Sequence, residues 1–300
     1  MPLVPFSELM AAAEQGQYAV GYFESWNLES LLAVADAAEA TRSPVILGFS
    51  GISLPSPERM VKEKLSVYAG LGLETCRSLG VPACLLFNES PDLNWVLESI
   101  DLGFNLVMFS DDQLGWEEQL EAIVRVVARA HPAGAAVEAE LTALPGIKGE
   151  LSMLPSESRL DDPAPARAFV ERTGVDALAV NVGQVHVHGR SQVHLDLSRL
   201  VQLRAAVPVP LVLHGATSVL REDLAAAAQG GVRKINVGSI LKRTFFETLR
   251  RASNRAGETY NPYQVMGSGM SGDVLIEARV ALQRVLEDYM RLFGSAGKAE

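Results

Sequence analysis

Carboxylate, amide and imidazole side chains follow several apolar segments of the 300-residue chain. In the segment ACLLFNES an apolar run ends in Asn88 and Glu89, and two later segments run into His186 and His214. Neutral imidazoles and carboxylates that converge on one point are typical ligands of a divalent metal ion. These residues therefore predict a metal site, for which Glu140 is a further candidate ligand.

Small residues follow the last two apolar segments. The stretch HGATS contains Gly215, Ala216 and Thr217, and the stretch NVGS contains Gly238 and Ser239. Loops of this kind expose several backbone N–H groups and can cradle a phosphate. The same residues also form ordinary turns, so the pattern alone leaves both interpretations open.

The elements that must position these residues alternate along the chain. Eight short apolar segments are the predicted strands: 18–23, 43–50, 82–88, 105–110, 135–141, 177–183, 210–216 and 234–239. Their nearly continuous apolar character is typical of parallel strands that are buried on both faces. The pieces between them have helical periodicity, and we predict helices over 27–42, 56–72, 115–131 and 163–174.

Eight strand–helix units within about 250 residues predict an α/β fold, the (β/α)8 TIM barrel. We expect a single domain over 1–300, with the barrel core in 1–250 and a C-terminal loop and helix in 251–300. A doubly wound sheet is the alternative, but no G-x-G-x-x-G motif follows a strand. In a TIM barrel the carboxyl ends of the strands form the active site, so the polar residues described above would meet there.

Composition limits the possible partners and the cellular compartment. Lys and Arg number 26 against 36 Asp and Glu, which gives a formal net charge of −10. An acidic chain without a basic cluster argues against nucleic acid or an anionic membrane as partner. The only cysteines are Cys76 and Cys84, so no disulfide framework is predicted. With no signal peptide or membrane-spanning segment recognised, we expect a cytoplasmic protein.

The longest recognisable motif is LVLHGATSVLREDLAAAAQGGVRKINV, which begins at residue 211. It resembles the class II, metal-dependent fructose-bisphosphate/tagatose-bisphosphate aldolases, and the resemblance extends in matching order over about residues 1–250. It implies a lyase that cleaves or forms a ketose phosphate by way of a metal-stabilised enediolate. By resemblance, His214 and His186 are metal ligands, with His188 as the alternative to His186, and Glu140 is a nearby carboxylate.

The chain departs from the family pattern at the residues that carry the chemistry. Where the family has an aspartate and a histidine ligand at the end of the third strand, this chain has Asn88 and Glu89. The resemblance places Lys148 at the position of the family's catalytic glutamate, with Glu150 close by, and Glu24 at a substrate-contacting asparagine. Glu89 can still bind a metal ion, whereas Asn88 can bind a substrate hydroxyl but cannot take up a proton at neutral pH.

The predicted site therefore has the same location as the active site of the family, with several of its residues substituted. Asn88, Lys148 and Glu150 are its candidate catalytic residues, and Glu89, Glu140, His186 and His214 its candidate metal ligands. The predicted substrate or phosphate contacts are Glu24, Ser50, Gly215, Ala216, Thr217, Asn236, Gly238 and Ser239. Glu24 and the pair Asp111–Asp112 could replace the missing base, although that pair is also placed to cap the next helix.

We expect a metal-dependent aldolase or retro-aldolase that acts on a sugar phosphate or sugar acid. The expected cofactor is a divalent metal, Zn²⁺ first, with Mn²⁺, Co²⁺ or Fe²⁺ as alternatives. The alternative functions are epimerisation of a sugar or sugar acid on the same fold, and binding of a sugar phosphate without catalysis. The resemblance also implies a homo-oligomer, either a dimer or a tetramer.

Overall fold

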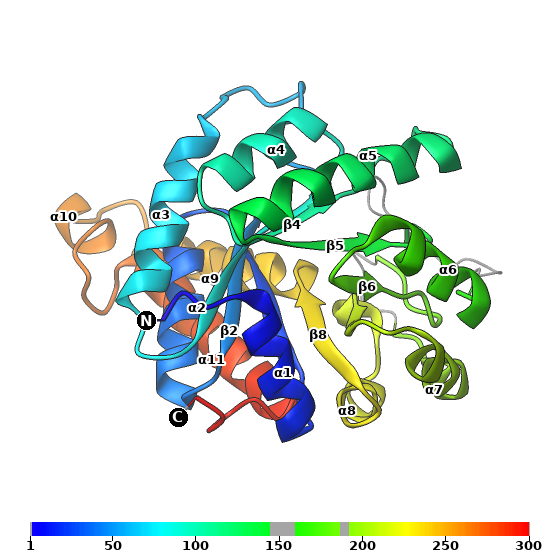
Figure 1. Cartoon of the computed structure of the whole chain (residues 1–300). Coiled ribbons are helices and arrows are strands. Elements are labelled where there is room, and N and C mark those ends of the chain that lie inside the picture. The colour runs from blue at the N-terminus through cyan, green and yellow to red at the C-terminus, as the bar shows by residue number, and fades with distance from the viewer. Residues whose placement is uncertain (1, 145–159, 187–191, 300) are drawn as a thin grey trace.

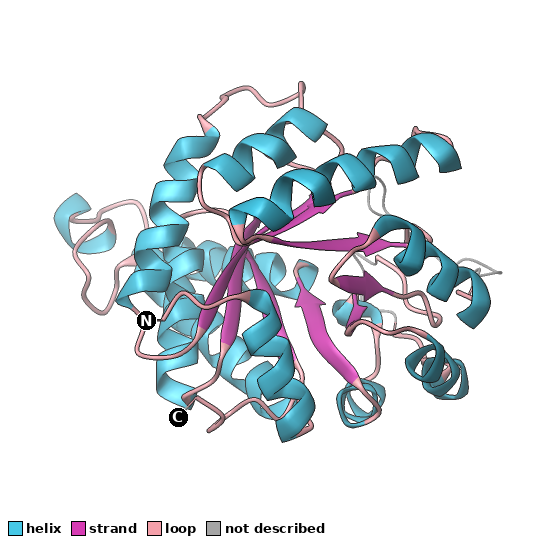
Figure 2. Cartoon of the chain, in the orientation of Figure 1, coloured by secondary structure: helices cyan, strands magenta, loops and turns pink. Residues whose placement is uncertain are grey.

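A closed parallel barrel is the centre of the molecule. The computed structural model of the chain describes residues 2–144, 160–186 and 192–299. Each strand pairs in parallel with its sequence neighbour, and β1 pairs with β8 to close the barrel (Figures 1 and 2). The strands are β1 (Val20–Ser25), β2 (Val45–Ser50), β3 (Ala83–Ser90), β4 (Leu106–Phe109), β5 (Ala136–Glu140), β6 (Ala177–Ala179), β7 (Leu211–Leu213) and β8 (Val232–Val237). This arrangement confirms the predicted TIM barrel.

Helices surround the strands and cover their outer faces (Figure 2). They are α1 (Phe6–Gly16), α2 (Leu28–Thr41), α3 (Leu65–Ser78), α4 (Leu93–Asp101), α5 (Trp116–Ala130), α6 (Pro163–Thr173), α7 (Leu197–Ala206), α8 (Arg221–Gln229), α9 (Ser239–Ala256), α10 (Pro262–Val265) and α11 (Val274–Leu292). The helix predicted over 56–72 is wrong in its first part, because turns occupy residues 51–55 and 57–58 and α3 begins only at Leu65. Two short 3₁₀ turns, η1 (His131–Ala133) and η2 (Ala216–Ser218), complete the described elements.

The inside of the barrel is apolar at one end and polar at the other. Helix α1 contributes Phe6, Leu9 and Met10 to a buried cluster with inward-facing strand residues such as Ile46 and Leu86. This cluster fills the end of the barrel where the strands begin. At the carboxyl ends of the strands the buried residues are charged or polar instead, which places the site at the end where TIM-barrel enzymes carry it.

The C-terminal helices pack against the barrel's first helices. Helix α11 contacts α2 and α9, and the Phe293 ring that follows it stacks on Phe23 of β1 with 6.4 Å between ring centroids. Asp273 caps α11 by accepting a hydrogen bond from the backbone of Leu275. The short helix α10 projects at the side of the molecule (Figure 1). A helix is thus present within the C-terminal segment 251–300, where the sequence predicts one.

Strand β3 contains an irregularity at its carboxyl end. Its pairing with β4 shifts by one residue between Phe87 and Ser90, which is the signature of a β-bulge. Glu89 lies in the bulge with φ = 53°, a left-handed conformation that is unfavourable for a residue with a β-carbon. A regular strand would point Asn88 and Glu89 to opposite faces, but both side chains are buried here and they bond to each other. The strained bulge therefore brings both residues to the same site.

Candidate active site

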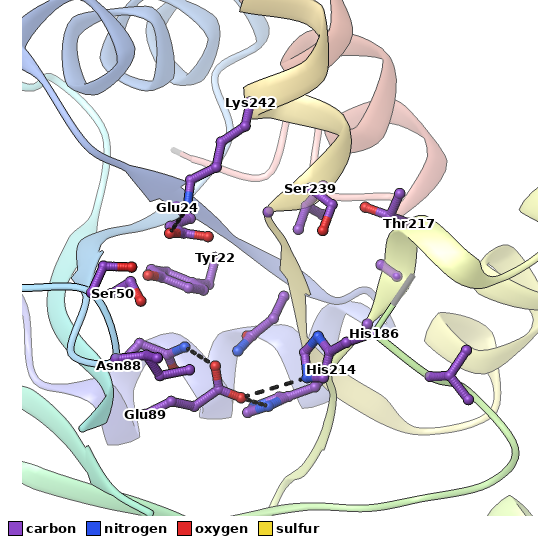
Figure 3. A pocket seen from close by; sticks show the side chains of 18 of the residues that line it. Tyr22, Glu24, Ser50, Asn88, Glu89, His186, His214, Thr217, Ser239 and Lys242 are labelled. Atoms are coloured by element: carbon purple, nitrogen blue, oxygen red, sulfur yellow. Dashed lines mark hydrogen bonds and ion pairs between the residues drawn. The ribbon is translucent and has the colours of Figure 1, made fainter. Parts of the chain in front are cut away.

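A cavity of about 380 Å³ opens at the carboxyl ends of the barrel strands. Its lining includes all eight residues that the sequence predicts as substrate or phosphate contacts. The cavity lies between the metal-binding candidates and the start of α9 (Figure 3). The predicted residues in the lining are Glu24, Ser50, Asn88, Glu89, His186, His214, Gly215, Ala216, Thr217, Asn236, Gly238 and Ser239. The fold thus gathers side chains that are more than 200 positions apart in the sequence.

Glu89, His186 and His214 form a triplet at one end of this cavity. One ligand atom from each residue lies within 4.8 Å of the other two. The Oε1 atom of Glu89 is 2.7 Å from Nδ1 of His214 and 4.0 Å from Nε2 of His186, and Figure 3 shows both interactions. His186 follows β6 in a non-strand segment, because β6 ends at Ala179.

His214 is held between two carboxylates. Its Nδ1 atom faces Glu89 at 2.7 Å and its Nε2 atom faces Glu138 at 2.8 Å, and all three side chains are buried. Burial alone would lower the pKa of His214, but the two carboxylates outweigh it and raise that pKa above its ordinary value. Burial likewise opposes ionisation of Glu89, yet the adjacent His214 holds the pKa of that carboxyl below its usual range. The two carboxylates on its two nitrogens thus favour the protonated form of the imidazole.

A buried ion pair supports this arrangement from inside the barrel. Lys234 lies 2.8 Å from Oε2 of Glu138 and donates to Oδ1 of Asn236 at 2.5 Å. Both members of the ion pair are fully buried. Burial lowers the pKa of the Lys234 ammonium, and Glu138 opposes that shift. The sequence interpretation gave neither residue a role, although a glutamate and a lysine within apolar strands β5 and β8 were a visible signal.

Three neutral polar atoms face the cavity from buried side chains. Among the residues that the structure describes, Tyr22 Oη, Asn88 Oδ1 and Asn236 Nδ2 lack a hydrogen-bond partner. Asn88 donates its amide N–H to Glu89 Oε2 at 2.9 Å, which leaves its carbonyl oxygen as an acceptor. Burial raises the pKa of Tyr22 well above its ordinary value, so this hydroxyl stays neutral. Buried polar groups normally have partners, so these three atoms are available to hydrogen-bond a bound ligand.

Glu140 lies next to the triplet but is not part of it. Its carboxylate accepts a hydrogen bond from Ser110, and the cavity lining does not include it. Burial, and secondarily the negative charge of Glu89, raise the pKa of Glu140 to about 7. Glu140 is thus a carboxylate next to the triplet, and its predicted role as a metal ligand stays a prediction.

The two small-residue loops meet on the opposite side of the cavity. Gly215 has φ = 68° and leads into the turn η2, and Gly238 directly precedes the 18-residue helix α9. Thr217 accepts a hydrogen bond from the backbone of Ile240 at 3.2 Å, which joins the loops. Lys242 and Arg243, in the first turns of α9, add positive charge to the lining. The sequence interpretation did not identify either cation.

The remaining candidates are elsewhere. Lys148, Glu150 and His188 lie outside the described residues. Asp111 and Asp112 form a turn with Gln113 and do not line the cavity. Their predicted role as a helix cap is wrong, because the residue that caps α5 is Gly115. The remaining described histidines, His131 and His194, lie outside the cavity and bond to Asp176 and Asp223 respectively.

The donor set of the triplet fits a divalent metal ion. Two imidazoles and one carboxylate are ligands that zinc and other transition metals accept. The His214 ring already donates from Nε2 to Glu138, and a carboxylate on the far nitrogen of a ligating histidine is the usual outer partner in metal sites. The Nδ1 proton that now joins His214 to Glu89 would give way to the ion. Glu89, His186 and His214 are thus the residues that could hold it.

A closed (β/α)8 barrel with a candidate metal triplet at the carboxyl ends of its strands defines the class of metal-dependent TIM-barrel enzymes. Comparison of the sequence with known proteins identifies one family within this class. The model of the class II fructose-bisphosphate aldolases matches residues 4–298. The chain belongs to the class II fructose-bisphosphate aldolase family, whose members are lyases that depend on a divalent metal.

Individual relatives match along their whole length. The fructose-bisphosphate aldolase of Geobacillus stearothermophilus is 33% identical, with 100% of this chain and 99% of that protein covered. The fructose-bisphosphate aldolase of Thermus caldophilus is 30% identical, with 99% and 100% covered. Among solved structures, the YdjI aldolase of Escherichia coli K12 superposes with a TM-score of 0.79 at 26% identity, and 99% and 100% of the two chains are covered.

None of the helices in the described part of the chain combines the length and the apolar character that crossing a bilayer requires.

The two cysteines, Cys76 and Cys84, are buried and do not form a disulfide.

Proposed function

We propose that this protein is a metal-dependent aldolase that cleaves or forms a carbon–carbon bond in a ketose sugar, its phosphate or a related sugar acid. The observation that carries this proposal is the triplet of Glu89, His186 and His214 beside a cavity of about 380 Å³. A cavity of this size accommodates a small sugar. Membership of the class II aldolase family supports the same reaction class.

Different residues of the chain would bind the substrate, orient a metal ligand and transfer protons in such a reaction. A divalent ion, when bound, supplies Lewis acidity for a carbonyl oxygen. Asn88 offers its free carbonyl oxygen to a substrate hydroxyl, which it holds without removing the proton. Glu138 and Lys234 keep the His214 ring in its orientation. Proton transfer at carbon is assigned to Lys148 or Glu150, both outside the described residues, as the family resemblance implies.

Asn88 is one of the residues by which this site departs from the family pattern. An amide cannot act as a general base at neutral pH, so the hydroxyl proton must leave to another group. The substrate therefore differs from that of relatives with an aspartate at this place, or the proton leaves by another route. Because this substitution allows an altered substrate, the test uses a panel of substrates and not a single one.

The test combines metal content with product trapping. Purified protein is dialysed against a chelator, reloaded with Zn²⁺, Mn²⁺ or Co²⁺, and incubated with ketoses, ketose phosphates and sugar acids. We expect carbonyl fragments that a hydrazine traps from at least one substrate, loss of this activity with the chelator, and its recovery with metal. Stereochemical inversion without fragments would indicate epimerisation instead. A protein that neither retains a metal nor responds to one would contradict the proposal and favour a binding protein without catalysis.

A further inference from the structure

The end of the cavity beside α9 carries an ion pair of its own. Glu24, in β1, accepts a hydrogen bond from Lys242 of α9, with 2.6 Å between Oε1 and Nζ (Figure 3). The Lys242 ammonium also lies 5.9 Å from the centroid of the Trp26 ring. The Glu24 side chain is 17% exposed and the Lys242 side chain 47%, so the pair lies at the open side of the cavity. The cation that could meet a ligand's phosphate is thus already neutralised by a carboxylate of the chain.

The other oxygen of Glu24 lies against the start of α9. A β-carbon at residue 238 would be only 2.7 Å from Glu24 Oε2, so Gly238 leaves room for this carboxylate. The amino end of an 18-residue helix carries partial positive charge and favours an anion. Glu24 therefore places a carboxylate of the chain itself beside Gly238, at the helix end that would otherwise favour an anion.

The other lining groups at this end favour a neutral ligand. Among the described residues, the buried atoms without a partner that line the cavity include Tyr22 Oη and Asn236 Nδ2, a hydroxyl and an amide. Arg243, the second cation in the lining, also has an interaction already. Neutral donors and acceptors bind hydroxyl groups without paying for a buried charge. Glu24 and Lys242 are opposite charges in direct contact, so they offset each other.

We propose that Glu24 is a specificity-determining residue that excludes a phosphate from the α9 end of the cavity and selects a substrate whose end there is neutral and hydroxylated. This inference rests on the proposed aldolase function, because it assigns the substrate class of the same site. A phosphate dianion would have to displace the Glu24 carboxylate or lie beside it. Like charges placed together in a binding site lower affinity and suppress the wrong partner.

Binding of a matched pair of probes tests the inference without turnover. The zinc-loaded protein is titrated calorimetrically with dihydroxyacetone and with dihydroxyacetone phosphate, which differ only in the phosphate. The wild type should bind the phosphorylated probe no more tightly than the neutral one. Glu24→Gln, which keeps the size and removes the charge, should gain roughly tenfold or more for the phosphorylated probe, since a like-charge contact is removed. The same variant should change by less than about threefold for the neutral probe, whose binding involves no such contact.

Control variants distinguish the effect of removing the charge of Glu24 from the effect of changing the net charge of the protein. Glu98→Gln removes one carboxylate from the exposed side of α4 and should behave like the wild type. Glu24→Asn is a second neutral variant, so the comparison survives if one variant folds poorly, and thermal unfolding identifies such a case. The inference is overturned if wild type and Glu24 variants bind the phosphorylated probe equally, whether tightly or not at all. Failure of the aldolase proposal would appear separately, as absence of metal-dependent cleavage.

Discussion

The two ends of the cavity hold their charges in different ways. At the metal end, Glu89, His214, Glu138 and Lys234 are buried, and each contacts a charged partner from across the barrel. At the α9 end, charge is confined to the partly exposed pair of Glu24 and Lys242, together with Arg243. The same chemical groups therefore have different consequences, because burial decides how costly it is to remove a partner.

This difference shows which features of the site are fixed and which can vary. A buried charge that loses its partner stays desolvated, so the network at the metal end must be kept or replaced as a unit. An exposed ion pair gains and loses little, and it can be exchanged without loss of the fold. We infer that the metal end sets the reaction class and that the α9 end sets the substrate.

The largest effect is expected from removing the buried cation. Lys234→Met leaves Glu138 buried without its ammonium partner and should lower the free energy of unfolding by about 3–5 kcal/mol. Urea unfolding of the metal-free protein measures this loss. The double variant Lys234→Met/Glu138→Leu should recover part of it, since no unpaired charge then remains in the barrel. A loss below about 1 kcal/mol for the single variant would show that the two ends do not differ as described.

Metal affinity is the next most sensitive property. Glu89→Ala removes one of three candidate ligands and should weaken metal binding by more than the roughly 100-fold that loss of an outer partner can cost. Competition with a chromogenic chelator gives the affinity, and elemental analysis after dialysis gives the content. His194→Ala removes an exposed histidine outside the cavity and serves as the matched control. Equal metal content in wild type and Glu89→Ala would rule out Glu89 as a ligand.

A smaller effect is expected at the outer partner of His214. Glu138→Gln keeps the size of the side chain but weakens its hold on His214 Nε2, and it should lower metal affinity by roughly 10–100-fold. The same chelator competition measures it, with Glu98→Gln as the control for loss of one carboxylate. If Glu138→Gln binds metal as tightly as the wild type, the carboxylate does not orient the ligand.

The smallest effect is expected at the α9 end. Lys242→Met removes the partner of Glu24 at the open side of the cavity and should change the free energy of unfolding by at most about 1 kcal/mol. Urea unfolding under the conditions used for Lys234→Met gives the direct comparison. A loss as large as that of Lys234→Met would mean that the two ion pairs are equally structural.

Much of the fold can be predicted from the amino-acid sequence alone. Apolar segments with intervening helical periodicity predicted the barrel, because hydrophobic patterning is local and the barrel repeats one unit. The residues at which the strands and helices begin and end were less predictable than the order of these elements. The expected strand over 177–183 is only Ala177–Ala179 in β6, so His186 reaches the site from a non-strand segment. Likewise, α3 begins only at Leu65, because residues 51–55 and 57–58 form turns and residues 56–64 contain no helix.

The sequence by itself determined the barrel, the end of it that carries the site, and the candidate status of Glu89, His186 and His214. The three-dimensional fold alone decided how they meet. A bulge with φ = 53° at Glu89 aims this side chain toward a histidine 125 positions away, and Glu138, Lys234 and Lys242 acquire their roles only from partners on other strands. The physical reason is that periodicity is a property of neighbouring residues, whereas the charge and hydrogen-bonding state of a buried group depends on what faces it across the barrel.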